Sequence, residues 1–185
     1  RLVSGEEWER LERGLVQRVR ALELFLDDVY GAQRILKEKA VPPELVLGAK
    51  GFEPKLVGVR PPGGVRMHVA GIDLIRDGQG TFRILEDNIR CPSGVSYVLE
   101  NRLLSKRILP DALDRARVQR VDLYPSKLAA ALRSVSPEDP DRSTVVVLTP
   151  GPFNSAYFEH SFLARTMGLE LVQAPDLYVE GDEVF

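Results

Sequence analysis

The sequence contains a single cysteine, Cys91, and two histidines, His68 and His160, among its 185 residues. One cysteine excludes an intrachain disulfide and a zinc site built from several cysteines, and it fits a reducing compartment, so we expect a cytoplasmic protein. His160 follows Glu159 without a second histidine at the spacing of a metalloprotease helix. His68 falls in a predicted strand with no identifiable partner. We therefore interpret both histidines as structural or exposed.

The sequence also lacks a long apolar run and an excess of charge of one sign. No apolar stretch approaches the roughly 20 residues that cross a bilayer, so we expect no association with a membrane. The 25 basic and 27 acidic residues are interspersed and give a formal net charge of -2, without the basic field that holds nucleic acid. Because 44% of the residues are hydrophobic, we expect a soluble globular protein with a packed core.

Helical patterns occupy much of the chain. Ser4 and Glu7 form a capping-box pattern ahead of an amphipathic stretch that Gly31 ends, which predicts a long helix. Four further helices are expected, over 33–39, from Ser93 or Ser96 toward Pro110, over 126–135 and over 156–167. The segment 44–64 is rich in turns, and 136–141 has the composition of a linker or exposed loop.

The run from Ser143 to Pro150 is rich in β-branched residues and is typical of a strand covered on both faces. The helix over 156–167, stopped by Gly168, and a strand over 169–173 follow it. Together these segments predict a βαβ unit. The fold class is therefore α/β, with an α+β portion ahead of the βαβ unit.

Two runs of strand-forming residues flank Asp77-Gly78-Gln79-Gly80 and predict a β-hairpin. With a loop of two or four residues, Arg76 faces Thr81 and Asp73 faces Ile84. A loop of three residues would change the parity of the pairing, and acids that share a face in the first register would then be separated.

Under the first register, Asp73, Glu86 and Asn88 project from one face, with the two carboxylates as diagonal neighbours roughly 7 Å apart at Cβ. Oxygen ligands of this type suit Mg²⁺, which takes one or two carboxylates together with substrate phosphates and water. Both acids lie in otherwise apolar strands, where a buried carboxylate pair would repel itself without a cation. The alternative is a hairpin with solvated polar residues at one end and no chemistry.

The turn after the second strand carries further candidates. Ser93 and Gly94 open a predicted helix, whose free backbone N–H groups and positive dipole end suit a phosphate or a carboxylate. Arg90 would reinforce that contact with its guanidinium group. A plain helix cap with a surface arginine is the alternative. Cys91 could be a nucleophile near the helix start, but no base can be assigned to it.

A second candidate region is the segment from Thr149 to Asn154, at the carboxyl end of a predicted strand, where open α/β sheets bind ligands. Asn154, Ser155 and Tyr157 are candidates to line an acceptor pocket. The segment lacks the Gly-Lys-Ser/Thr ending of a phosphate-binding P-loop. A strand-to-helix turn capped by Ser155 is the alternative.

The segment from Gly71 to Arg102 closely resembles the signature of bacterial circularly permuted ATP-grasp proteins of uncharacterised function, which are related to glutathionylspermidine synthetases. The segment from Val145 to Val179 resembles the same proteins in compatible order. The resemblance therefore covers roughly residues 65–179.

In the synthetase relatives, an aspartate on one strand and a Glu-x-Asn on the next bind the magnesium ions that bridge the ATP phosphates. The resemblance assigns these roles to Asp73, Glu86 and Asn88. The turn Cys91-Pro92-Ser93 resembles a Thr-Pro-Thr-like turn near the substrate of the relatives. The relatives have an arginine two residues before the metal-binding aspartate, where this chain has Gly71, and the catalytic phosphate or substrate contact would then pass to Arg90.

The resemblance implies a partial circularly permuted ATP-grasp fold. Residues 1–120 would hold a helical segment and the ATP-grasp hairpin with the metal ligands. Residues 121–185 would form a Rossmann-like preATP-grasp domain, truncated at its C-terminus. Both ends of the chain look cut, so the remainder of its own chain would complete the nucleotide site, and this piece would be inactive by itself.

The activity implied by the resemblance is that of an ATP-dependent carboxylate–amine ligase that works through an acylphosphate. ATP and Mg²⁺ are the cofactors, and the partners are small-molecule or peptide carboxylates and amines. Two alternatives remain open. One is a non-catalytic α/β binding or scaffold module, and the other is a cysteine-dependent transferase that uses Cys91.

Overall fold

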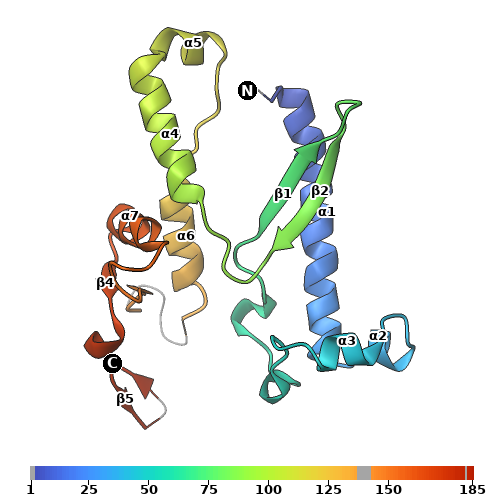
Figure 1. Ribbon diagram of the computed structural model, residues 1–185. Helices are drawn as coiled ribbons and strands as arrows, with labels where there is room; N and C mark the ends of the chain where they lie inside the picture. The colour runs from blue at the N-terminus through green and yellow to red at the C-terminus, as the bar shows by residue number, and fades with distance from the viewer. Residues whose placement is uncertain (1–2, 137–142, 182) are drawn as a thin grey trace. The chain divides into compact units, whose positions relative to one another are not determined.

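The computed structural model describes residues 3–136, 143–181 and 183–185 (Figure 1). The chain divides into two compact units, Arg1–Pro92 and Ser93–Phe185. The helices and small two-stranded sheets of the described residues fit the α/β class. The division into a hairpin portion, 1–120, and a Rossmann-like portion, 121–185, stays a prediction.

The first unit begins with the long helix α1, Gly5–Val29. The capping box is confirmed, because the N–H of Glu7 donates to Ser4 Oγ and the N–H of Ser4 donates to the Glu7 carboxylate, each at 3.3 Å. Helices α2 (Arg34–Lys37) and α3 (Pro43–Leu47) follow, and the 3-10 turns η1 (Pro54–Leu56) and η2 (Pro62–Gly64) occupy the turn-rich segment. His68 is exposed and lies outside the strands of the structure.

Strands β1 (Gly71–Arg76) and β2 (Phe82–Asn88) form the predicted hairpin. Its loop, however, has three residues. The N–H of Asp77 donates to the Thr81 carbonyl and the N–H of Gly80 donates to the Asp77 carbonyl, both at 2.9 Å. Gly80 has φ = 82°, a left-handed conformation that closes this type of loop at little cost to glycine. The predicted register was therefore wrong, because Arg76 pairs with Phe82 and not with Thr81.

A second irregularity, within the strand pairing, restores the predicted assignment of side chains to the two faces of the hairpin. Leu74 pairs with Ile84 and Asp73 pairs with Glu86, which leaves Leu85 as the extra residue of a β-bulge. The bulge offsets the three-residue loop, so Asp73 and Glu86 return to one face. They lie directly opposite each other and are not the diagonal neighbours that the sequence predicted.

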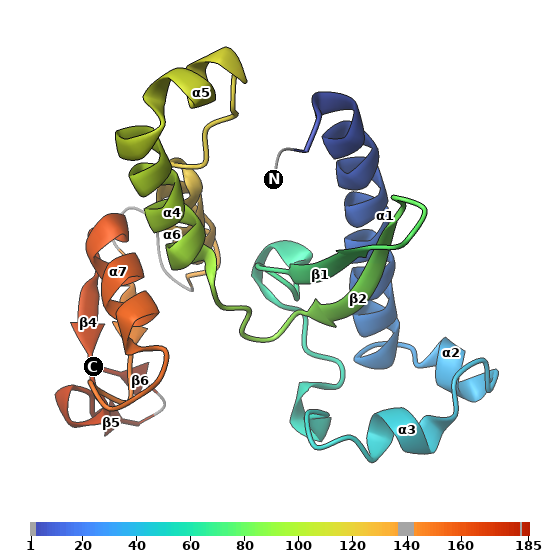
Figure 2. The ribbon, with the colours of Figure 1, turned by 45° about the horizontal axis from the view of Figure 1, so that its top comes forward.

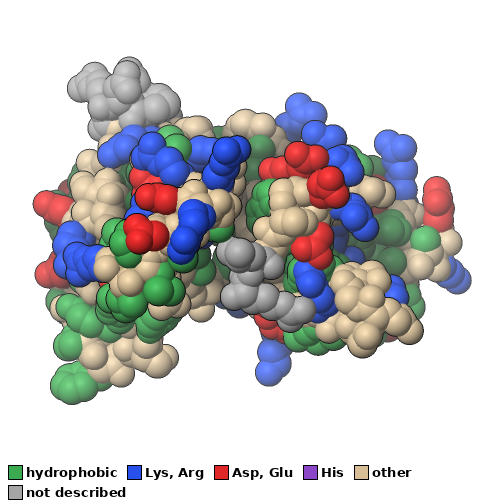
Figure 3. Space-filling model, turned by 90° about the horizontal axis from the view of Figure 1, so that it is seen from above, with side chains coloured by type: hydrophobic (Ala, Val, Ile, Leu, Met, Phe, Trp, Pro, Cys, Tyr) green, Lys and Arg blue, Asp and Glu red, His purple; other side chains and the backbone are tan. Residues whose placement is uncertain are grey.

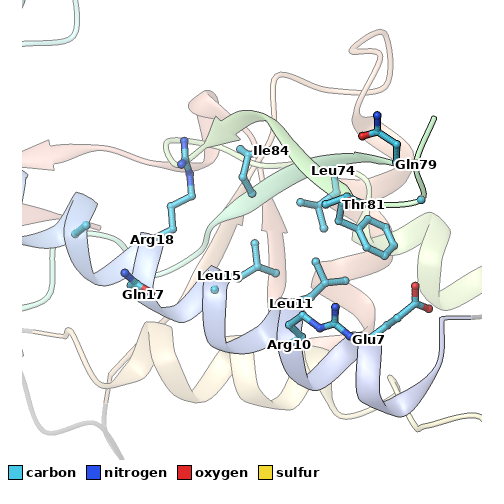
Figure 4. A pocket seen from close by; sticks show the side chains of 14 residues that line it. Glu7, Arg10, Leu11, Leu15, Gln17, Arg18, Leu74, Gln79, Thr81 and Ile84 are labelled. Carbon is cyan, nitrogen blue, oxygen red and sulfur yellow. The ribbon is translucent and has the colours of Figure 1, made fainter. Parts of the chain in front are cut away.

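The other face of the hairpin packs on α1. Leu74 and Ile84 line the space above Leu11 and Leu15 of the helix (Figure 4). Ion pairs join the two elements near both ends of the hairpin: Arg76 pairs with Glu7, and the guanidinium of Arg18 donates two hydrogen bonds of 2.7 and 2.6 Å to the Asp87 carboxylate. These contacts fix which face of the hairpin the helix covers.

The stability of the contact between the hairpin and α1 should depend on pH. The hydrogen bond from Arg18 lowers the pKa of Asp87 below its ordinary value. A carboxyl group with a lowered folded-state pKa stabilises the fold above its unfolded-state pKa of about 3.9, and the stabilisation is lost as the pH falls through the folded-state value. We expect the amides of β2 to be less protected at low pH, where protection is the exchange rate of the unfolded chain divided by that of the folded protein at the same pH. The variant Asp87→Asn should lack this pH dependence, and an unchanged dependence in the variant would contradict the assignment.

The second unit begins with three helices, α4 (Val95–Ile108), α5 (Pro110–Arg115) and α6 (Tyr124–Arg133). The prediction ended the first of these near Pro110 and missed α5, because a proline that ends one helix also suits the first position of the next. Buried residues from α4, α6, α7 and β4 form the core of this unit: Leu99, Ala129, Phe162, Ala164 and Val172.

The predicted βαβ unit is present, and Figure 2 labels its helix α7 and its second strand β4. Strands β3 (Val146–Leu148) and β4 (Glu170–Val172) are parallel neighbours, joined by α7 (Tyr157–Met167), which ends at Gly168 in a left-handed conformation. Leu148 is 57% exposed, so the expectation of a strand covered on both faces was wrong within the described residues. The 3-10 turn η3 (Ala174–Asp176) and the hairpin of β5 (Val179–Glu180) and β6 (Glu183–Val184) follow.

Two predictions from composition concern the surface. The predicted linker at 136–141 lies, apart from Ser136, outside the described residues. In the part of the chain that the structure describes, no helix is both long enough and apolar enough to cross a membrane. Basic and acidic side chains are interspersed over the face shown in Figure 3.

Candidate functional site

The hairpin carries Asp73, Glu86 and Asn88 on the face turned away from α1. Asp87, between the last two, points the other way and pairs with Arg18 of α1, so its neighbours on β2 project outward. All three side chains are exposed, and Asn88 Nδ2 donates a 3.2 Å hydrogen bond to Glu86 Oε1. We call these three residues the acidic face. The expectation that the two acids would form a buried pair was wrong for the described residues.

The charge of the acidic face is not balanced within the described residues. No lysine or arginine there forms a salt bridge with Asp73 or Glu86. The other two acids of the hairpin differ, because Asp77 pairs with Arg83 at 2.9 Å and Asp87 pairs with Arg18 at 2.6 Å. Like charges directly opposite each other on a sheet are destabilising. A cation at this position would remove the repulsion.

The donor set of the acidic face fits a magnesium ion that also takes ligands from a substrate. Among the described residues, no group of three or more His, Cys, Asp and Glu side chains could hold a metal ion. Two carboxylates and an amide oxygen leave positions for phosphate oxygens and water, which is the coordination that Mg²⁺ commonly adopts in nucleotide sites. Asn88 turns Nδ2, and not its amide oxygen, toward Glu86, so the amide would have to rotate for that oxygen to join Glu86 on one ion.

The turn after β2 carries two exposed residues, Arg90 and Cys91, behind the half-buried Ile89. Cys91 is a free thiol, but α4 begins only at Val95, so the cysteine is not placed at the start of the helix. The helix dipole acts within the first turn. The expected activation of the thiol by a helix start is therefore not supported by its position.

The N-terminus of α4 is already occupied by a carboxylate. Glu159 of α7 accepts hydrogen bonds from the N–H of Gly94 at 2.7 and 2.8 Å, from the N–H of Ser96 at 2.9 Å and from Ser96 Oγ at 2.6 Å. The expectation that the N–H of Gly94 would be free for a phosphate was wrong in this structure. Ser93 is exposed. The sequence predicted that a phosphate or a carboxylate binds at this helix start, and the carboxylate of Glu159 takes that place.

Glu159 is only 5% exposed and keeps its charge through these contacts. Burial by itself raises the pKa of the carboxyl group, but the hydrogen bonds from Ser96 and Gly94, together with the charge of His160, outweigh it and hold the pKa below its ordinary value. Tyr124 responds in the opposite sense, because burial and the negative charge of Glu159 raise the pKa of its hydroxyl group. Glu159 was not identified as a site residue from the sequence.

A second network lies at the carboxyl end of β3. Thr149 is 2% exposed, and its Oγ1 lies 2.9 Å from Nδ1 of His160 and accepts a 3.2 Å hydrogen bond from the N–H of Gly151. This contact with the buried Thr149 is consistent with the structural interpretation of His160. Asn154 Oδ1 accepts a 2.9 Å hydrogen bond from the N–H of Ala156, so Asn154 and not Ser155 closes the turn into α7. Tyr157 is half-buried at the start of α7, and its substrate role stays a prediction.

A pocket of about 760 Å³ lies between α1 and the hairpin (Figure 4). The strand register puts the acidic face on the other side of the hairpin. Leu11, Leu15 and Ile84 form part of its apolar lining, and Arg10 and Arg18 contribute charged groups. None of the three residues of the acidic face lines it. This pocket is therefore distinct from the candidate metal site.

The family model described as "Circularly permuted ATP-grasp type 2" matches residues 1–185. An uncharacterised protein of Mycobacterium tuberculosis is 55% identical over 185 residues, which is 100% of this chain and 34% of the relative. An uncharacterised protein of Synechocystis is 51% identical over 179 residues, covering 97% of this chain and 37% of the relative. A Frankia alni protein named "Putative glutamate--cysteine ligase 2-3" is 43% identical over 188 residues, covering 100% of this chain and 22% of the relative. The chain thus spans about a third of the first two relatives.

Proposed function

The chain belongs to the circularly permuted ATP-grasp type 2 family, and from this premise we propose that it is part of an ATP-dependent ligase that joins a carboxylate to an amine. The observation that carries the proposal is the direct pairing of Asp73 with Glu86, two exposed carboxylates that no described basic residue neutralises. Membership of an ATP-grasp family supports Mg-ATP as the partner of that pair. The ligase name of a Frankia relative supports the reaction class.

We propose that the carboxylates of Asp73 and Glu86 and the amide oxygen of Asn88 hold Mg²⁺. When bound, the ion neutralises charge on the phosphoryl group that is transferred. Arg90, which is exposed on the turn directly after β2, contacts the phosphate or the substrate carboxylate through its guanidinium group. Since the N–H of Gly94 is committed to Glu159, Ser93 is the remaining candidate for a contact at the start of α4.

The proposed reaction has two steps. A carboxylate oxygen of the first substrate attacks the γ-phosphorus of ATP, so ADP leaves and an acylphosphate forms. The nitrogen of the amine then attacks the acyl carbon, inorganic phosphate leaves, and the amine loses a proton to give the amide. The chain's residues bind and orient the reactants for these steps, which is the main contribution that proteins make to phosphoryl transfer.

The second unit has its own candidate region, for binding of the acceptor substrate. We propose that its βαβ unit is a Rossmann-like preATP-grasp domain and that Asn154 and Tyr157 line the acceptor pocket at the carboxyl end of β3. The parallel pairing of β3 and β4 supports the Rossmann-like part of the proposal. Because the relatives are much longer than this chain, we propose that the rest of the protein completes the nucleotide site and that this chain is inactive by itself. A cytoplasmic location stays a prediction.

The proposal is tested by measuring ADP release from the complete protein. We expect release to require Mg²⁺, a carboxylate substrate and an amine, with one amide formed for each ADP. Tight binding of ATP with no turnover across a panel of carboxylates and amines would contradict the ligase and favour a non-catalytic binding module.

The variant Cys91→Ser separates the ligase from a cysteine-dependent transferase. Since no helix start activates the thiol, we expect the variant to release ADP at the rate of the unchanged protein. Mass spectrometry of the protein stopped during turnover should find no thioester. Loss of activity together with a trapped thioester on Cys91 would favour the transferase.

A further inference from the structure

Gly71 begins β1 and lies against the turn that follows β2. It pairs with Asn88 across the ladder. A β-carbon on residue 71 would lie 2.7 Å from Cβ of Pro92 and 3.7 Å from Cβ of Asn88. Separations below 3.0 Å essentially never occur for a Cβ atom. The space that a side chain at residue 71 requires is thus filled by Pro92.

The contact between Gly71 and Pro92 lies at the end of the acidic face. Side chains alternate along a strand, so a β-carbon on residue 71 points to the same side as Asp73. Asn88, whose Cβ is near the same point, belongs to that face. The chain therefore turns back after Asn88 and places Pro92 beside it, with Arg90 on the short segment between them.

This packing is rigid on both sides. Cβ of Pro92 belongs to a ring that includes the backbone nitrogen, so it cannot move aside by a change of rotamer. Gly71 is in a strand, paired through the ladder, and cannot withdraw without disturbing the partners of Asp73 and Asn88. A side chain at residue 71 would consequently displace the backbone of the turn and not merely a flexible neighbour.

We propose that Gly71 is a positioning residue for the acidic face: its lack of a side chain lets Pro92 pack against β1, and this contact holds Asn88 and the Arg90 segment in register with Asp73 and Glu86. The inference rests on the proposed magnesium site. It also gives a physical reason for glycine where the synthetase relatives have an arginine, since an arginine at residue 71 would force Pro92 to move.

The test compares Mn²⁺ binding by the complete protein and by Gly71→Ala, each in the presence of ADP, using the electron paramagnetic resonance signal of free Mn²⁺. We expect the variant to bind Mn²⁺ about 10-fold more weakly, the size of effect typical of residues that orient metal ligands. Gly78→Ala is the matched control, because Gly78 lies in the loop of the same hairpin with no atom within 4 Å of a β-carbon. The control should bind Mn²⁺ as the unchanged protein does.

The double variant Gly71→Ala with Pro92→Gly removes the atom that the new β-carbon would meet, and it should recover part of the lost Mn²⁺ affinity. Unchanged binding by Gly71→Ala, or no recovery in the double variant, would overturn the inference. The proposed function fails separately: if Asp73→Asn and Glu86→Gln bind Mn²⁺ with ADP as tightly as the unchanged protein, the acidic face is not the metal site.

Discussion

Replacing Asp73 with asparagine or Glu86 with glutamine lowers ADP release by the complete protein at least about 100-fold. Substitution of residues that only orient metal ligands already lowers metal affinity or activity by about 10- to 100-fold, and here a proposed ligand itself is lost. Each substitution keeps the size of the side chain and removes one negative charge from the directly opposed pair. The proposed ion then loses a ligand, and charge on the transferred phosphoryl group is less well neutralised. The measurement is the rate of ADP release at saturating ATP and substrates, as a function of Mg²⁺ concentration.

Asp77→Asn is the matched control for these variants. Asp77 lies on the same hairpin, and its Oδ1 accepts hydrogen bonds from the N–H groups of Gln79 and Thr81 at 3.1 and 2.8 Å. Asparagine retains an oxygen that can accept both, so the loop should keep its structure. We expect near-normal ADP release from the control. Equal losses in Asp77→Asn and Glu86→Gln would mean that any acid on the hairpin matters in the same way, and the metal assignment would be wrong.

The variant Glu159→Gln should destabilise the complete protein by about 3 kcal/mol, as expected when a buried group loses charged hydrogen bonds and donors are left without acceptors. The carboxylate of Glu159 accepts from the N–H groups of Gly94 and Ser96 and from Ser96 Oγ. An amide offers one acceptor oxygen and turns an NH₂ group toward these donors. The measurement is denaturant unfolding, followed by hydrogen exchange at the amides of Gly94 and Ser96. Glu170→Gln, at an exposed position of β4, is the control and should change the stability little.

The same variant should change how stability depends on pH. The pKa of Glu159 is lowered in the folded state, so its stabilisation is present above the ordinary carboxyl pKa of about 4.3 and is lost as the pH falls through the folded-state value. We expect the difference in unfolding free energy between the unchanged protein and Glu159→Gln to be greatest at neutral pH and to shrink in acid. A difference that stays constant from neutral pH to acid would contradict a charged Glu159.

The elements with local signals were predictable from the sequence. The capping box of Ser4 and Glu7 and the apolar spacing behind it fixed the start of α1, and Gly168 marked the end of α7. The βαβ unit followed from a run of β-branched residues, a helix and a second strand. In each case neighbours within a few residues determine the structure, so no tertiary contact had to be known.

The register of the hairpin was harder to predict from the sequence. Gly80 in a left-handed conformation makes the loop three residues long, and the sequence contains that glycine, so this part of the error was avoidable. The bulge at Leu85 has no comparable local signal. It coincides with two tertiary requirements: Ile84 must face α1, and Asp87 must reach Arg18 of the same helix. The shared face of Asp73 and Glu86 was thus predicted for a reason that the structure does not support, because two irregularities offset each other.

Glu159 shows a different limit. A glutamate in the first turn of a helix is usually read as a favourable charge at that helix's own N-terminus. Here the side chain caps α4, where its partner Ser96 lies 63 residues away in the sequence. A local signal exists in hindsight, since Glu159 stands three residues before the buried Phe162 and therefore on the inward side of α7. The partner itself could not be inferred without the fold.

In the proposed site, the acidic face holds the metal ion of the nucleotide. The most direct measurement is anomalous X-ray scattering from crystals of the complete protein grown with Mn²⁺ and ADP. We predict a manganese peak within about 2 Å of carboxylate oxygens of Asp73 and Glu86, the distance typical of the small octahedral ions that such sites bind. A manganese peak at the ADP phosphates with both carboxylates uncoordinated would contradict the claim.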